Sequence, residues 1–136
     1  MRLVFDNNTW ISFAIGNHMK DIPAILLRPD IELFACRELI EEFERVCQYE
    51  KIKHHLKPER LVSTIELIHI KASIAEITNS LADFSDPKDN YLLDLCAEVA
   101  VDFLVTGDKR LLLLNVYRTT KIITFNELRD LLGIKG

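Results

Sequence analysis

The stretch Leu3-Val4-Phe5-Asp6-Asn7-Asn8 carries an aspartate directly after a short apolar run, and Phe103-Leu104-Val105-Thr106-Gly107-Asp108 repeats this arrangement. Each apolar run is typical of a buried strand. If both strands belong to one parallel sheet, Asp6 and Asp108 emerge at its carboxyl edge, where open α/β sheets bind ligands. Carboxylates that converge there repel each other unless protons or metal ions neutralise them. The two stretches therefore predict an acidic metal site at a sheet edge.

Strand and helix signals alternate along the rest of the chain. Strands are expected at residues 2–6, 31–35, 102–106 and 121–124, and residues 73–77 fit either a strand or a helix. Helices are expected at residues 9–16, 19–28, 37–49, 58–71, 85–100, 109–114 and 125–132. Asn7 or Asn8 can cap the first helix, and Thr124 with Glu127 has the spacing of a capping box. This alternation predicts a single α/β domain over residues 1–136 with a largely parallel sheet.

Composition and charge exclude several classes of protein. The 136 residues are 49% hydrophobic and 28% charged, as expected of a globular domain. The net charge of −4 argues against a protein that coats nucleic acid through its overall field, although it is compatible with a nuclease whose site is itself acidic. No apolar run approaches the length of a membrane span, and Asp6 interrupts the stretch that a signal peptide would need. We therefore expect a cytoplasmic location.

Cysteine and histidine are not spaced as in a zinc site. Cys36, Cys47 and Cys96 lie far apart among apolar residues and are expected in the core. His54 and His55 are adjacent, so their side chains need not converge. The sequence also lacks GxxxxGK[ST], GxGxxG and GxSxG, which removes the phosphate-loop and hydrolase-elbow interpretations. The acids are therefore the best candidates for chemistry.

A third acidic segment lies in the helix expected at residues 37–49. At 100° per residue its apolar side chains form one arc, made by Leu39, Ile40, Phe43, Val46 and Cys47. Glu41 points away from this arc and is expected in solvent. Glu42 and Glu44 border the arc on opposite sides, so either could reach a shared site. Periodicity alone does not choose between them.

A fourth acidic segment is Ser85-Asp86-Pro87-Lys88-Asp89-Asn90. Asp86 at the N-cap, Pro87 at the first helical position and Asp89 in the first turn would make a stable helix start. Capping and chemistry explain this segment about equally well. Asp89 would nevertheless lie near the edge where the two strand-end aspartates are expected. Asp94, further along the same helix, is expected on its solvated face.

Asp108 also has a structural explanation, because it can cap the short helix that follows it. Gly107 lets the backbone turn sharply off the strand, and Thr106 offers a hydroxyl to a carboxylate or a bound water. Any one acid is explained by capping or solvation. Four acids at successive strand ends or helix edges have no such common explanation.

The ordered set of acidic segments resembles the PIN-domain family of metal-dependent ribonucleases. The matching segments are Val4–Asn8, Glu38–Phe43, Asp86–Asn90 and Val105–Lys109, so that the resemblance extends from residue 3 to about residue 125. The pieces Asp-Pro-Lys-Asp-Asn and Thr-Gly-Asp-Lys-Arg-Leu-Leu look most like the toxins of toxin–antitoxin systems. The resemblance implies a three-layer α/β/α sandwich with a central, mostly parallel sheet.

The resemblance also implies an acidic set that would act in catalysis and hold Mg²⁺ or Mn²⁺: Asp6, Glu42, Asp89 and Asp108. It thereby selects Glu42 over Glu44. It favours Asp89 as the third acid, with Asp86 kept as the alternative. Hard carboxylate ligands suit both ions, and such ions can activate water for in-line attack on a phosphodiester.

Other residues would support this set or contact the substrate. Asn8 would orient the site, and Thr106 would supply a hydroxyl to it. Lys109 and Arg110 beside Asp108 are candidates for binding RNA, as is the basic connector at residues 51–57. Single-stranded RNA is the expected substrate, because an unpaired backbone can bend into the site.

The function expected on this resemblance is a metal-dependent endoribonuclease, the toxin of a toxin–antitoxin pair. An antitoxin partner and a homodimer are implied in the same way. Two alternatives belong to other classes. One is a catalytically silent PIN-like module that binds RNA or a protein partner. The other is a different Mg²⁺-dependent phosphoryl-transfer enzyme, which would act on small phosphate esters.

Overall fold

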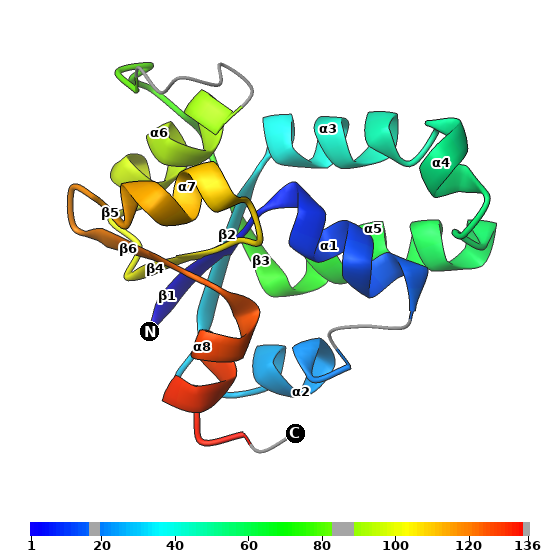
Figure 1. Cartoon of the computed structure of the whole chain (residues 1–136), viewed down its shortest axis with the longest axis horizontal. Helices are drawn as coiled ribbons and strands as arrows, with labels where there is room; N and C mark the ends of the chain where they lie inside the picture. Colours follow the sequence, from blue (N-terminus) through cyan, green and yellow to red (C-terminus); the bar gives the residue numbers. More distant parts are fainter. Residues whose placement is uncertain (17–19, 83–88, 135–136) are drawn as a thin grey trace.

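A six-stranded sheet forms the centre of the computed structural model, which describes residues 1–16, 20–82 and 89–134 (Figure 1). The strands are β1 (Arg2–Phe5), β2 (Glu32–Cys36), β3 (Ala72–Ala75), β4 (Phe103–Val105), β5 (Val116–Tyr117) and β6 (Thr120–Ile123). Their order across the sheet is β3-β2-β1-β4-β6-β5. Every neighbouring pair is parallel except β5 with β6. The expected largely parallel sheet is therefore confirmed.

Helices cover both faces of this sheet. They are α1 (Asn7–Ile15), α2 (Ile22–Leu26), α3 (Arg37–Val46), α4 (Glu50–Lys53), α5 (Pro58–Lys71), α6 (Asn90–Val99), α7 (Lys109–Leu114) and α8 (Phe125–Leu131). Figure 1 shows α1, α3 and α5 on one side of the strands and α6 and α7 on the other. This is the expected three-layer α/β/α arrangement. No helix in the described part of the chain is long and apolar enough to cross a membrane.

The strand order reverses at β1, the central strand. The chain runs from β1 outward to β2 and β3 on one side, and then returns to β4 and β6 on the other side. In open α/β sheets ligands bind at such a reversal, just beyond the carboxyl ends of the strands. Asp6 directly follows β1, and its backbone N–H donates to the carbonyl of Val105 at 3.0 Å. The hydrogen bonding between β1 and β4 thus continues as far as Asp6, the first of the acids.

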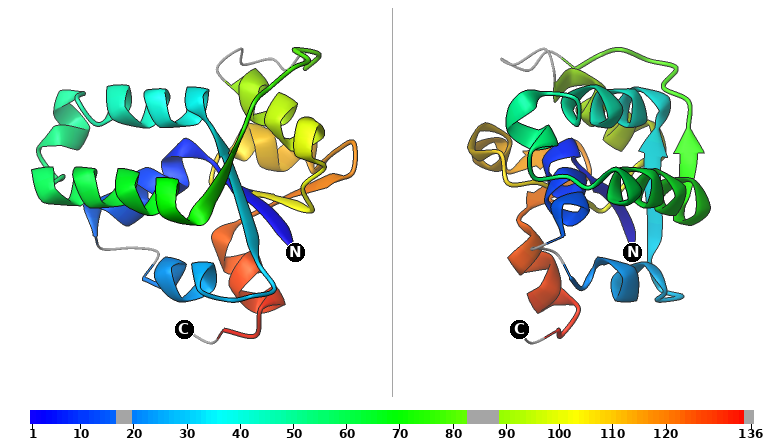
Figure 2. Two further views of the ribbon diagram at one scale, coloured as in Figure 1. Left: turned by 180° about the vertical axis from the view of Figure 1, so that it is seen from behind. Right: turned by 90° about the vertical axis from the view of Figure 1, so that its right-hand side faces the viewer.

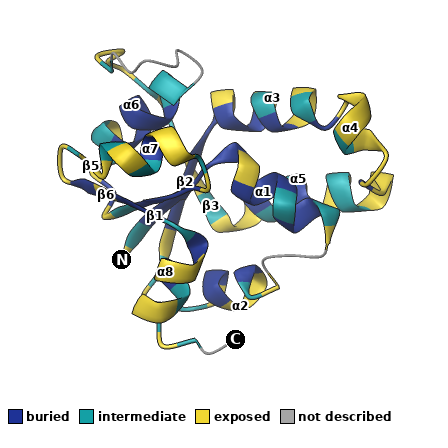
Figure 3. Ribbon diagram, in the orientation of Figure 1, coloured by how far each residue is buried: buried dark blue, intermediate teal, exposed yellow. Residues whose placement is uncertain are grey.

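The core lies on both faces of β1 and its neighbours, as the burial colours show (Figure 3). Leu3, Val4 and Phe5 are wholly buried, as expected of a central parallel strand covered by helices on both sides. The rings of Phe5 and Trp10 meet edge to face with centroids 5.4 Å apart, which fixes α1 on the strand that precedes it. All three cysteines are buried and free, as expected.

Several expected boundaries need correction. The first helix begins at Asn7 and is capped by the side chain of Asp6, so neither asparagine is the cap. The helix expected at 19–28 is only α2, Ile22–Leu26, and residues 51–57 include part of α4. The ambiguous stretch at 73–77 contributes the edge strand β3, and β5 was not expected at all. The capping box of Thr124 and Glu127 is confirmed.

The start of α6 also differs from the expectation. The helix begins at Asn90, and Asp89 occupies the N-cap position without a side-chain cap hydrogen bond. The expected N-cap, Asp86, lies outside the described residues.

Asp94 is buried, so its expected place on a solvated face is wrong. Its Oδ1 accepts hydrogen bonds from the backbone N–H groups of Leu81, at 3.0 Å, and Ala82, at 2.8 Å. One turn further along α6, Glu98 accepts the N–H of Thr78 at 2.8 Å. The segment that leaves β3 therefore lies along α6 and uses its carboxylates as backbone acceptors. Helical periodicity could not reveal these partners.

We expect Asp94→Ala to lower the free energy of unfolding by about 1–3 kcal/mol, because two partly buried N–H groups lose their acceptor. Urea unfolding followed by circular dichroism measures this change. Glu66→Ala, an exposed acid on α5, is the control and should change stability by less than about 0.5 kcal/mol. Equal stabilities of the two variants would contradict a structural role for Asp94.

Candidate active site

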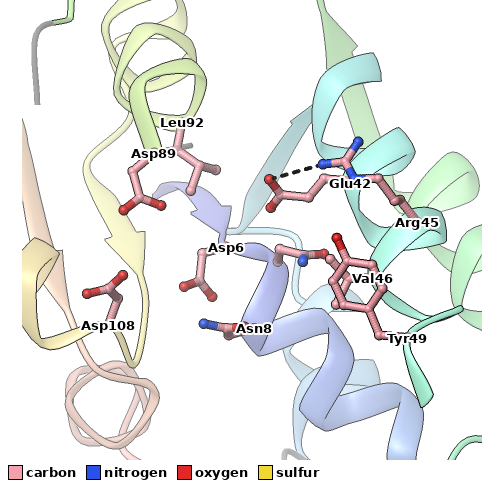
Figure 4. Close-up of a pocket in the computed structure, with 10 residues that line it drawn as sticks. Asp6, Asn8, Glu42, Arg45, Val46, Tyr49, Asp89, Leu92 and Asp108 are labelled. Atoms are coloured by element: carbon pink, nitrogen blue, oxygen red, sulfur yellow. Dashed lines mark ion pairs between the residues drawn. The ribbon is translucent and has the colours of Figure 1, made fainter. Parts of the chain in front are cut away.

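A pocket of about 310 Å³ opens beyond the carboxyl ends of β1 and β4, at the point where the strand order reverses (Figure 4). The residues that line it are Asp6, Asn7, Asn8, Glu42, Arg45, Val46, Tyr49, Asp89, Leu92 and Asp108. Four of these are acids, and each comes from a different part of the fold: the end of β1, helix α3, the start of α6 and the end of β4. The structure thus brings together all four residues of the expected acidic set.

Asp6 is 3% exposed and is held by three hydrogen bonds. Its Oδ1 accepts the N–H of Thr9 at 2.8 Å and the hydroxyl of Thr9 at 2.6 Å, and its Oδ2 accepts the hydroxyl of Thr106 at 2.5 Å. Burial raises the pKa of Asp6 above its ordinary value, which outweighs the lowering by these hydrogen bonds, and the charge of Asp108 raises it further. A cation in the pocket would favour the ionised form.

Asp108 lies beside Asp6 and is linked to it through Thr106. The Thr106 hydroxyl donates to Asp6 and accepts the backbone N–H of Asp108 at 3.0 Å. Asp108 itself caps α7, because its Oδ1 accepts the N–H of Arg110 at 2.8 Å. Both strand-end acids are therefore helix caps whose carboxylates also line the pocket.

Glu42 reaches the pocket from α3, whereas Glu44 is exposed and does not line it. The Tyr91 hydroxyl donates to Glu42 Oε1 at 3.0 Å, and Arg45 Nη2 lies 3.9 Å from Oε2. Burial and the neighbouring Glu42 raise the pKa of Tyr91 well above its ordinary value, so the phenol stays protonated and remains a donor. Of the two glutamates that periodicity left open, Glu42 is the one that lines the pocket.

The carboxylates of Asp89 and Asp108 point toward that of Asp6, and the Asn8 amide lies close to it (Figure 4). Asn8 is exposed at the rim of the pocket. Lys109 and Arg110 are exposed at the start of α7, next to the pocket but not among its lining residues. The alternative third acid, Asp86, lies outside the described residues.

Three polar contributors were missed in the sequence. Tyr91 follows Asp89 by two residues, and its role becomes visible only in the fold, where its hydroxyl at the start of α6 reaches Glu42 on α3. Arg45 follows Glu42 by three residues, which is the helical spacing of one face and the signal that could have indicated it. Tyr49 lies beyond the end of α3, at the N-cap position of α4, so helical spacing does not place it at the pocket.

The donor set is one of hard oxygens, suited to Mg²⁺ or Mn²⁺ rather than to zinc or copper. Within the described residues, however, no three His, Cys, Asp or Glu side chains form a ready-made metal centre. One more oxygen is available: Asn7 Oδ1 is buried at the pocket and accepts no hydrogen bond from the described residues. A buried oxygen that lacks a hydrogen-bond donor could accept a hydrogen bond from a water bound to a cation.

Comparison with known proteins agrees with this geometry. A family model described as the PIN domain matches residues 2–110, from the first residue of β1 to the first turn of α7. The matched part includes all four pocket acids. Among curated proteins, no sequence matches the chain at a significant level. PIN domains are generally nucleases, and the match spans well over half of the 136 residues. The chain therefore belongs to the PIN-domain family and has a nuclease-type fold.

Proposed function

We propose that this chain is a Mg²⁺- or Mn²⁺-dependent endoribonuclease that cuts single-stranded RNA. The observation that carries the proposal is the meeting of four carboxylates in one pocket at the reversal point of a PIN fold. A set of acids without a matching set of bases repels a phosphodiester unless a cation intervenes. The pocket therefore supports a reaction that depends on a divalent ion.

The residues that would hold the ion are Asp6, Glu42, Asp89 and Asp108, with Asn8 and the unsatisfied oxygen of Asn7 nearby. Their oxygen donors suit Mg²⁺, which keeps several of its waters and needs only one or two carboxylates in direct contact. When bound, such an ion activates water and stabilises the charge that develops on the phosphate.

The chain's own residues position these acids. Hydrogen bonds from Thr9 and Thr106 fix both oxygens of Asp6. Tyr91 and Arg45 hold Glu42 at the opposite wall. Outside the pocket, Lys109 and Arg110 offer positive charge to the phosphates that flank the scissile bond.

We extend the proposal to a biological role as a cytoplasmic toxin that forms a homodimer and is neutralised by a cognate antitoxin. The support is the likeness of the Asp86–Asn90 and Thr106-Gly107-Asp108-Lys109-Arg110 segments to those of toxins in toxin–antitoxin systems.

A second candidate function is a silent module that binds RNA or a protein without cutting. The observation in its favour is that the described acids do not form a compact metal centre. The presence of all four carboxylates in the pocket favours the nuclease.

We expect the purified protein to cleave a mixed-sequence single-stranded RNA with Mg²⁺ or Mn²⁺ and not with EDTA. Asp108→Asn should lower the rate by about a hundredfold or more, because one charged group of the site is lost. The fold should survive, since asparagine is as good an N-cap for α7 as aspartate. Asp130→Asn, an exposed acid on α8, is the matched control.

Equal cleavage by the wild type and Asp108→Asn would refute the site assignment. RNA binding without cleavage by the wild type would favour the silent module. Hydrolysis of a small ester such as p-nitrophenyl phosphate would instead indicate a different phosphoryl-transfer enzyme.

We also expect Mg²⁺ or Mn²⁺ to stabilise the folded protein, because the ion binds the pocket acids only when they are assembled. Binding at a hundred times the dissociation constant adds about 2.7 kcal/mol, which is a rise of several degrees in Tm. Differential scanning fluorimetry measures this shift. The shift should shrink in Asp6→Asn and persist in Asp130→Asn; the same shift in all three proteins would place the ion elsewhere.

The toxin role predicts that induced expression of the wild-type chain arrests the growth of a bacterial host. Asp108→Asn, expressed to the same level, should allow growth, because the arrest depends on cleavage. Growth curves with immunoblotting make this comparison. Arrest by both proteins would show that toxicity does not come from the pocket.

A further inference from the structure

A second cavity lies at the opposite end of α1 from the acidic pocket. Its volume is about 650 Å³, and it is lined by Phe13, Ile15, Gly16, Lys20, His55, Lys57 and Arg60. We call it the basic cavity, because its described lining contains two lysines, an arginine and a histidine but no acid. The right-hand view of Figure 2, taken from this end of the molecule, shows α1 beside α5.

Arg60 forms the inner wall of the basic cavity. Its guanidinium donates to the carbonyls of Phe13, at 2.6 Å, and Ala14, at 3.2 Å, and lies 4.8 Å above the Phe13 ring. These carbonyls belong to the last turn of α1, where the helix dipole is negative. Because Arg60 satisfies and neutralises them, the end of α1 does not repel an anion that enters the cavity.

The outer wall carries positive side chains for which no hydrogen bond or ion pair is found among the described residues. Lys57 is exposed at the N-cap position of the 14-residue helix α5, and its side chain makes no cap hydrogen bond. The N-terminus of a helix carries a partial positive charge that favours anions, and in α5 the exposed Glu59 of the first turn offsets part of it without lining the cavity. Lys20 and His55 are exposed at the same rim. The positive charges of Lys20 and Lys57 and the partial positive charge at the start of α5 therefore all lie at the same cavity.

We propose that the basic cavity binds a backbone phosphate of the RNA strand whose scissile bond lies in the acidic pocket. This inference rests on the proposed ribonuclease function and adds a second contact point for the substrate. The two sites lie at the two ends of α1, which has nine residues and is about 13 Å long. At the rise of one strand in a duplex, roughly 3.4 Å per phosphate, that distance corresponds to about four nucleotides, and an extended single strand spans it with fewer.

The surface between the two sites suits a single strand. Tyr49 lines the acidic pocket and is 53% exposed. Helix α4 follows Tyr49 directly and leads to His55 at the basic cavity. An exposed aromatic ring near exposed cations, here Lys51 and Lys53 of α4, is the combination with which proteins bind unpaired nucleic acid, because bases stack on the ring while phosphates contact the cations. The one acid of α4, Glu50, lies 3.4 Å from His54 Nε2. This favours RNA over an acidic protein as the occupant.

The test is the affinity of a fluorescein-labelled twelve-nucleotide single-stranded RNA, measured by anisotropy with Ca²⁺ in place of Mg²⁺. The acidic pocket then has a cation available, while Ca²⁺ does not take the strict octahedral geometry that Mg²⁺ demands. A gel run beside the titration checks that the RNA stays intact. The variant is Lys20→Ala with Lys57→Ala, both exposed positions whose truncation should leave the fold intact. Lys121→Ala, an exposed lysine on β6, is the matched control. A labelled dinucleotide is the control ligand, because it is too short to span both sites.

We expect the double variant to bind the twelve-nucleotide RNA about fivefold more weakly at 0.1 M salt, the effect of losing one phosphate contact on a single strand. The slope of log K against log salt should become shallower by about 0.7. Binding of the dinucleotide should not change, and the control should bind both RNAs as the wild type does. Unchanged binding of the longer RNA by the double variant would overturn the proposal.

Two further outcomes separate this proposal from others. If the double variant loses affinity for polyglutamate but not for RNA, the cavity binds an acidic protein, and the RNA assignment is wrong. If the wild type never cleaves RNA with Mg²⁺ or Mn²⁺ but the fivefold loss is found, the proposed nuclease function fails while the RNA-binding cavity stands.

Discussion

Burial of the Asp6 carboxylate at the end of the central strand is the constraint on which the rest of the site depends. A buried carboxylate is costly unless its oxygens are hydrogen-bonded. Here the donors come from Thr9 on α1 and Thr106 after β4, so one side chain ties a helix and a second strand to the end of β1. Thr106 also holds the backbone of Asp108. The position of one acid thus fixes the position of the next.

Capping and chemistry, which compete as explanations when each segment is considered alone, are combined in this fold. Asp6 and Asp108 each accept a backbone N–H at the start of a helix and still line the pocket. The arrangement has a physical advantage, because the N-terminus of a helix stabilises negative charge. Two acids can therefore lie close together in the absence of a cation, and the pKa of Asp6 is raised mainly by its burial and only to a lesser extent by the charge of Asp108.

The parts of the site that could be predicted are those set by local pattern. An apolar run followed by an acid indicates a strand end, and parallel strands place their carboxyl ends at one edge, so the meeting of Asp6 and Asp108 followed from the sequence. The choice of Glu42 over Glu44 did not follow from periodicity and needed the family resemblance. The roles of Tyr91 and Asp94 depend on what packs against α6, and a sequence pattern carries no information about such partners.

Helix α1 separates two regions of opposite charge. Its first turn faces the acids, and its last turn is neutralised by Arg60. The orientation matches the helix dipole at both ends, since the positive end meets carboxylates and the negative end meets a guanidinium. Because Trp10 and Phe13 bury one side of α1 in the core, the helix is a rigid spacer. A polyanion that needs a cation at one end of this spacer would meet positive groups at the other. On the proposed function, this arrangement would let a chain with a net charge of −4 bind RNA.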